Sequence, residues 1–226
     1  LSSMPGWQNA DGETRKRILD AAYMYVLEKE PDIGDWLVGN IFRRPEAAGY
    51  RALFLIAKEG DMDRVPAEVW SKWAPIVMWY STFIGAGVVD TSFTGTIGES
   101  TKSLHSRLLC TAYKHAPDKV LQTLRKLIDK ENKAGEHIFI VGAIEPCWDE
   151  RVAKLIVRKA KQSAMKPACV GTLLRHLLRH DVTEAVKHCE SLLKTVKSSQ
   201  KKHIFDTALH AAEALLLESP KKRWAI

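Results

Sequence analysis

Apolar residues recur along this chain at the spacing of α-helices. Between residues 103 and 220 the chain contains three copies, and the beginning of a fourth, of one unit. The unit is an apolar helix, a break and a second, amphipathic helix. The second helices carry Val120, Val152 and Val186 in their first turns, and these valines are 32 and 34 residues apart. Such a period is typical of stacked helix pairs, because one pair cannot bury its apolar face alone. We therefore predict an all-α fold, a right-handed α-solenoid of stacked antiparallel helix pairs.

Capping and breaking residues predict where individual helices begin and end. Asp11 is a suitable N-cap for a helix over residues 12–30, and Pro45 and Gly60 bound the next helix. Pro66 opens a third helix, and Pro75 either opens a fourth or kinks one longer helix. Further helices are expected near residues 101–115, 117–131, 136–145, 149–163, 167–179, 182–197 and 200–217.

One long irregular stretch divides the pattern. Residues 85–100 are rich in Gly, Thr and Ser and lack helical periodicity. We predict an N-terminal helical part over residues 1–84, a loop or boundary over 85–100, and a helical-pair repeat region over 101–226.

Charge changes sign at the same place. Residues 1–100 carry 10 basic and 14 acidic side chains, and the remainder carries 24 basic and 13 acidic ones, for a net charge of +7. The basic repeat region is most simply a solvated lysine-rich surface, and an acidic or anionic partner is the alternative interpretation.

Basic residues within the repeat fall in rows. Arg151, Lys154, Arg158 and Lys161 share one face of their helix. Similar rows on the helices before and after include Lys126, Lys187 and Lys194. If these helices stack side by side, the rows form one cationic surface suited to an acidic protein or a phosphate backbone. We take these seven residues as candidate binding residues.

A tryptophan cluster precedes the irregular stretch. Trp70, Trp73 and Trp79 lie within ten residues of one another. They suit either a stacking platform or protein-binding hot spot, or a bulky core. We expect the core, since tryptophan is usually largely buried.

The sequence carries no complete catalytic or cofactor-binding motif. The glycines near residues 85–98 lack the spacing of dinucleotide- or phosphate-binding loops. His176 and His180 lie one turn apart, but a metal site would need a third ligand such as Cys189 or His188 from the next helix. Asp149 would be the first carboxylate to test in a DNA-repair enzyme, but helix capping explains it. An enzyme is not supported, and neither a cofactor nor a metal is expected.

The four cysteines form no close pair in the sequence. Cys110, Cys147, Cys169 and Cys189 all lie in apolar helical pattern, which suggests reduced core thiols in a cytoplasmic protein. No apolar run has the length of a membrane span, and no signal peptide is evident. The start at Leu1, with Met4 inside, is what a segment of a longer chain would show.

The helix-pair period and turn positions resemble the HEAT and armadillo class of α-solenoids over roughly residues 103–220. The N-terminal part, with Trp7, Ala48 to Leu53 and Trp70 to Pro75, resembles helical regions that follow the nucleotide-binding core of some bacterial STAND/NACHT-type ATPases. That core is absent here, so this resemblance implies a ligand-sensing or scaffolding segment and no catalytic residue. We expect a macromolecule-binding module of a larger protein, most simply one that binds protein. The alternative is nucleic-acid binding through the basic surface, including a HEAT-like DNA-repair glycosylase.

Overall fold

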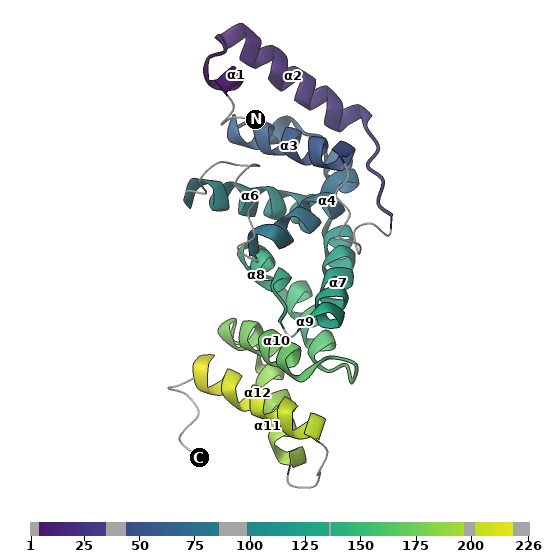
Figure 1. Ribbon diagram of the computed structural model, residues 1–226, viewed down its shortest axis with the longest axis vertical. Helices are drawn as coiled ribbons and strands as arrows, with labels where there is room; N and C mark the ends of the chain where they lie inside the picture. The colour runs from purple at the N-terminus through teal and green to yellow at the C-terminus, as the bar shows by residue number, and fades with distance from the viewer. Residues whose placement is uncertain (1–4, 35–43, 86–98, 136, 197–201, 219–226) are drawn as a thin grey trace. The chain divides into compact units, whose positions relative to one another are not determined.

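A computed structural model describes residues 5–34, 44–85, 99–135, 137–196 and 202–218 (Figure 1). Every regular element in these ranges is helical, and none of the described residues forms a strand. The all-α prediction is therefore confirmed for this part of the chain. The α-helices are α1 (Pro5–Gln8), α2 (Gly12–Glu28), α3 (Arg44–Lys58), α4 (Ala67–Gly85), α6 (Glu99–His115), α7 (Pro117–Ala134), α8 (Ile140–Ile144), α9 (Glu150–Ala160), α10 (Pro167–Arg179), α11 (Thr183–Val196) and α12 (Lys202–Glu218), and short 3-10 helices cover Met62–Arg64 (η2) and Glu145–Cys147 (η3).

Local signals mark the helix ends as expected. The carboxylates of Asp11 and Asp149 accept hydrogen bonds from the backbone N–H three residues later, at 2.7 and 2.9 Å. Gly60 has a φ of 86° and closes α3, a conformation that suits glycine. Pro75 lies inside α4, so the longer single helix is the alternative that the structure shows. Most of the predicted boundary, residues 86–98, lies outside the described residues.

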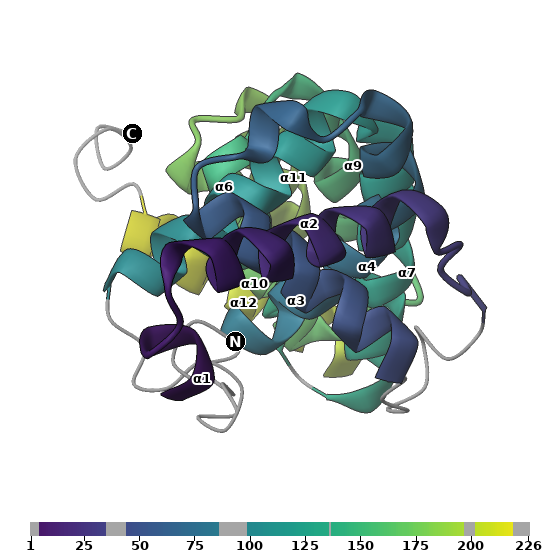
Figure 2. The same cartoon turned by 90° about the horizontal axis from the view of Figure 1, so that it is seen from above.

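The helices gather into two compact units. The first comprises residues 1–127 and 143–147, and the second comprises residues 128–142 and 148–226. In the first unit α2 packs against α3 (Figure 2) and α4 packs against α6. In the second unit α10 contacts α9, α11 and, most extensively, α12. None of the described helices combines the length and apolar character that a bilayer crossing requires.

The tryptophan cluster forms the core of the first unit. Trp70, Trp73 and Trp79 expose 1%, 0% and 2% of their surface, which confirms the core interpretation. The Trp73 indole N–H donates to the carbonyl of Val26 at 2.9 Å, tying α4 to α2. Gly49 makes room for this ring, because a Cβ built there would lie 1.9 Å from Trp73 Cη2. These rings are not available as a stacking surface.

A buried histidine lies next to this core. His105 on α6 hydrogen-bonds through Nδ1 with the Tyr50 hydroxyl, and Tyr50 stacks on Tyr80 with ring centroids 4.3 Å apart. No described residue bonds the buried His105 Nε2. Burial lowers the pKa of His105 to about 4 and raises the pKa of Tyr50. The imidazole is therefore neutral in the folded protein at neutral pH.

This histidine should make folding sensitive to acid. An unfolded histidine has a pKa of about 6.5, so between that value and about 4 the unfolded chain binds the extra proton and stability falls as pH falls. Going from about pH 7.5 to about pH 5 should cost about 2 kcal/mol through His105. Urea unfolding of wild type and His105→Phe at both values checks this. Between these two pH values, His105→Phe should lose about 2 kcal/mol less stability than wild type. An equal loss in both proteins would show that another group causes the pH dependence.

The cysteines depart from expectation. Cys110 of α6 and Cys147 of η3 form a disulfide with Cα atoms 5.3 Å apart, whereas Cys169 and Cys189 are buried and belong to no disulfide. The expectation of four reduced thiols is wrong for the first pair, because α6 and η3 pack together in the first unit although their cysteines are 37 residues apart. Cysteine usage therefore gives no argument for a reducing compartment.

Candidate functional site

The predicted basic row lies on the exposed face of α9. The helix buries Val152, Leu155 and Ile156 on its opposite face. Arg151, Lys154 and Arg158 are exposed along α9, and Lys161 is exposed at its C-terminal end. These four residues are called the α9 basic row below. The 3.6-residue period separates the two faces, as the sequence predicts.

The other candidate residues are exposed on different helices. Lys126 lies on α7 in the first unit, and Lys187 and Lys194 lie on α11 in the second. Lys130, which belongs to the predicted row of Lys126, is half-buried, and burial lowers its pKa. Within the second unit, burial lowers the pKa of His188 on α11, and the nearby backbone of Ala160 at the end of α9 opposes this shift. The α11 lysines are thus carried by a helix that reaches the end of α9.

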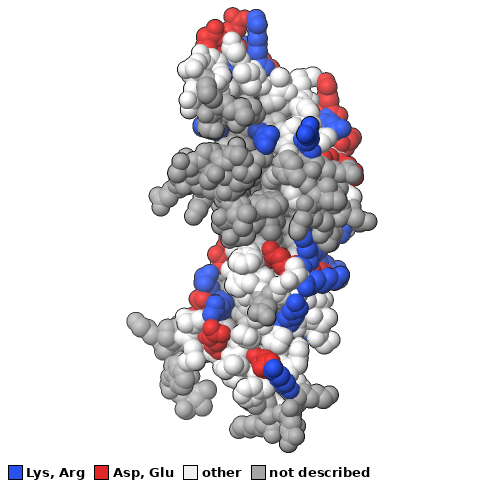
Figure 3. All heavy atoms as spheres, in the orientation of Figure 1, with Lys and Arg blue, Asp and Glu red and all other residues white. Residues whose placement is uncertain are grey.

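Acidic side chains interrupt the positive surface. Lys154 pairs with Glu150 at 2.7 Å, and the two side chains are 65% and 80% exposed. Figure 3 shows acidic and basic atoms interspersed on the visible face. An exposed pair of this kind contributes only a few tenths of a kcal/mol to folding. The surface around the α9 basic row therefore carries both charge signs, with a positive excess.

One lysine of α9, Lys159, is buried in an ion pair instead of lying on the exposed face. The Lys159 side chain is only 4% exposed and forms an ion pair with Asp129 at the end of α7. Lys159 follows Val152 by seven residues and Ile156 by three, so the helical period already places it on the buried face. That spacing was the signal by which the burial of Lys159 could have been anticipated.

The structure also forms a polar pocket that sequence reasoning missed. A cavity of about 170 Å³ opens in the second unit beside α10 and α12. We call it the α10–α12 pocket. It is lined by Ala168, Gly171, Thr172 and Arg175 from α10, His210 and Glu213 from α12, and His137 from the segment between α7 and α8. Its α10 residues have helical spacing, but the α12 and His137 contributions come from distant sequence and carry no motif.

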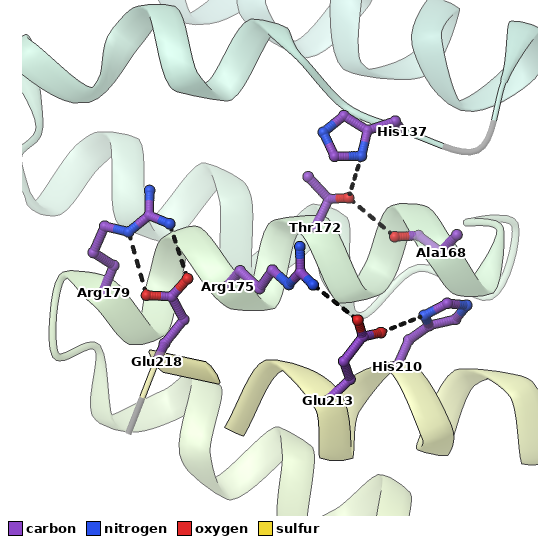
Figure 4. A network of polar contacts seen from close by, with 8 residues as sticks. All are labelled: His137, Ala168, Thr172, Arg175, Arg179, His210, Glu213 and Glu218. Carbon is purple, nitrogen blue, oxygen red and sulfur yellow. Dashed lines mark hydrogen bonds and ion pairs between the residues drawn. The ribbon is translucent and has the colours of Figure 1, made fainter. Parts of the chain in front are cut away.

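Hydrogen bonds hold the side chains of this pocket in place (Figure 4). Arg175 Nη2 donates to Glu213 Oε1 at 2.9 Å, and the other oxygen of Glu213 lies 3.3 Å from His210 Nδ1. Thr172 Oγ1 donates to the Ala168 carbonyl at 3.1 Å and lies 3.3 Å from His137 Nδ1. Glu213 therefore positions both a guanidinium and an imidazole at the cavity wall.

Close helix packing shapes the floor of the pocket. A Cβ built on Gly171 would lie 2.8 Å from the Cβ of His210, so glycine permits the close approach of α10 and α12. His137 lies at the opposite wall, where its ring contacts Phe139 with centroids 4.4 Å apart. Burial and the nearby positive charge of Arg175 lower the pKa of His137. The pocket thus combines one fixed cation, one fixed anion and two imidazoles.

A second ion pair of the same kind lies one turn along α10. Arg179 donates to Glu218 through Nε at 3.3 Å and Nη2 at 2.8 Å, and neither residue lines the pocket (Figure 4). The two arginine–glutamate pairs join the same two helices. They differ in whether the arginine faces the cavity.

His180 and Asp149, which the sequence analysis considered for a metal site and for catalysis, make structural contacts. His180 stacks on Trp148 with ring centroids 3.9 Å apart, and no three His, Cys, Asp or Glu side chains of the described residues cluster as metal ligands would. The Asp149 carboxylate accepts the Val152 N–H as a helix cap.

Comparisons of the chain with protein-family models, curated proteins and solved structures find no match.

Proposed function

We propose that the chain is an all-α binding module of a larger protein that recognises an acidic protein surface through the α9 basic row. The observation that supports this proposal is the exposure of Arg151, Lys154, Arg158 and Lys161 together, opposite a face that supplies the packing contacts. Exposed like charges a turn apart repel one another weakly and add nothing to folding. An acidic partner relieves this repulsion, so the row has a physical use in binding.

The surface chemistry favours protein over nucleic acid. The row extends only about 15 Å at 1.5 Å per residue, and Glu150 lies at its N-terminal end, paired with Lys154. Duplex binding typically involves several phosphate contacts on a continuous positive surface. A short row that carries its own carboxylate suits a protein partner with both charge signs, as most interface rims have.

The proposal includes a HEAT-like arrangement of helix pairs in the repeat region. The 32- and 34-residue period supports it, as do the contacts of α10 with α9, α11 and α12 inside the second unit. In such a solenoid the outer residues of successive helices present an extended binding surface. Lys187 and Lys194 would then extend the α9 basic row within this unit. No residue is proposed as catalytic.

Reversing two charges of the row tests the function. Lys154→Glu with Arg158→Glu should weaken binding of fluorescently labelled poly-glutamate at least about tenfold, which is about 1.4 kcal/mol. The melting temperature should change by no more than about 2 °C, because exposed substitutions usually cost under about 0.5 kcal/mol. Fluorescence anisotropy and thermal unfolding measure the two effects.

A matched control uses basic residues of α2 in the first unit. Lys16 and Arg17 are exposed, and Arg17 pairs with Glu13 four residues earlier, as Lys154 pairs with Glu150. Lys16→Glu with Arg17→Glu makes the same change in net charge and should leave binding within about twofold of wild type. Equal weakening in both proteins would show a net-charge effect only. If duplex DNA binds more tightly than poly-glutamate and its affinity falls steeply as the salt concentration rises, the surface binds nucleic acid and not protein.

A further inference from the structure

We propose that the α10–α12 pocket binds a small tetrahedral oxyanion, the phosphate group of a small molecule. The cavity, at about 170 Å³, is several times the roughly 30 Å³ that one water occupies in the liquid. It has room for a phosphate and part of the group attached to it. The site is independent of the α9 basic row, since none of the residues of that row lines it.

Arg175 supplies the fixed positive charge. Of its five N–H donors, one, on Nη2, bonds Glu213. Figure 4 shows another guanidinium nitrogen pointing away from Glu213, toward the side of His137 and Thr172. The planar fork of arginine matches two oxygens of a phosphate. Glu213 holds this fork in position while leaving donors for a ligand.

The hydrogen-bond partners favour one tautomer of each histidine. The Thr172 hydroxyl donates to the Ala168 carbonyl, so it accepts from His137 Nδ1–H. The ionised Glu213 is an acceptor, so His210 Nδ1–H donates to it. In each neutral ring the remaining Nε2 is therefore an acceptor. A protonated ring becomes a donor at Nε2 as well, and only then can it bond an anion there.

Charge balance then links anion binding to proton uptake. With neutral imidazoles, Arg175 and Glu213 cancel, and a dianion would be held by one guanidinium against one carboxylate. The groups that face His137 are Thr172, Phe139 and the Arg175 cation, and Glu213 faces His210. A bound anion opposes the effect of Arg175 and favours the protonated form of the ring. Affinity should therefore rise as the pH falls through the range in which His137 gains a proton.

Calorimetric titration with inorganic phosphate and with sulfate tests the site. At about pH 6, Arg175→Gln should weaken phosphate binding at least about tenfold. Arg179→Gln is the matched control, because it removes the same kind of ion pair between the same helices outside the pocket. The control should bind phosphate within about twofold of wild type, and the two variants should have similar melting temperatures.

Sulfate isolates the proton linkage, because it stays a dianion where phosphate itself titrates. Wild type should bind sulfate several-fold more tightly at about pH 6 than at about pH 7.5, and His137→Gln should reduce this pH dependence. His137→Gln also serves as the second variant if Arg175→Gln does not fold, since His137 is exposed and joins no interhelical ion pair. Equal weakening in Arg175→Gln and Arg179→Gln, or no saturable binding of either anion by wild type, overturns the proposal.

Discussion

Replacing Trp73 by alanine is expected to lower the free energy of unfolding by about 3–5 kcal/mol. The indole is fully buried between α4, α3 and α2, so its removal forfeits the transfer free energy of the ring and leaves a cavity. The substitution also removes the donor to the Val26 carbonyl, which lies 2.9 Å from the indole nitrogen. An acceptor left unbonded in the interior adds to the loss.

Equilibrium urea unfolding of Trp73→Ala and Trp148→Ala measures this effect. Trp148 is half-buried and stacks on His180, so its loss should cost clearly less. Full stability of Trp73→Ala together with lost partner binding would instead make the cluster a recognition surface.

The contact between Gly49 and Trp73 allows a complementary change. Gly49→Ala would place a methyl group 1.9 Å from Trp73 Cη2, which the structure accommodates only by moving α3 or the ring. Such overpacking typically costs about 1–3 kcal/mol. Combining Gly49→Ala with Trp73→Leu should cost less than the sum of the two single changes, since the smaller side chain removes the clash. Strict additivity would show that the two residues do not share one packing constraint.

Replacing Asp129 by asparagine should cost about 3 kcal/mol, because it leaves the buried Lys159 ammonium without its counter-charge. The Lys159 side chain is 4% exposed and that of Asp129 is 46% exposed, so water replaces only part of the lost interaction. Asparagine keeps the shape and one acceptor oxygen of the aspartate. The expected loss therefore reports the charge more than the packing.

Glu150→Gln is the matched control for the charged pair. It removes the carboxylate partner of Lys154, whose ion pair is exposed on both sides, and should cost at most about 0.5 kcal/mol. Chemical unfolding of the two variants at low and high salt separates them further, since salt screens exposed charges far more than buried ones. A negligible cost for Asp129→Asn would mean that Lys159 finds another acceptor or reaches solvent. If Asp129→Asn shows the expected loss, adding Lys159→Met should restore most of the lost stability, as apolar replacements of buried pairs often do.

The sequence predicted features that depend on neighbours within one or two helical turns. Asp11 and Asp149 cap their helices, and Gly60 ends α3, because capping involves groups three or four residues apart. The exposure of the α9 basic row followed from the 3.6-residue period alone. Burial of Trp73 followed from its large apolar surface. The solenoid order of the repeat and the partner of the basic row stay predictions.

Only the tertiary structure decided which distant residues meet. The pairing of Cys110 with Cys147 and the gathering of His137, Arg175 and Glu213 at one cavity join segments that share no local pattern. Such contacts depend on how closely helices approach, and that distance is set by packing at positions such as Gly171 against His210. Helical periodicity indicates which face of a helix is apolar. It does not indicate which other helix packs against that face, because many apolar surfaces can bury it equally well. The sequence by itself therefore determined the helices and their faces, and packing in three dimensions determined the pocket.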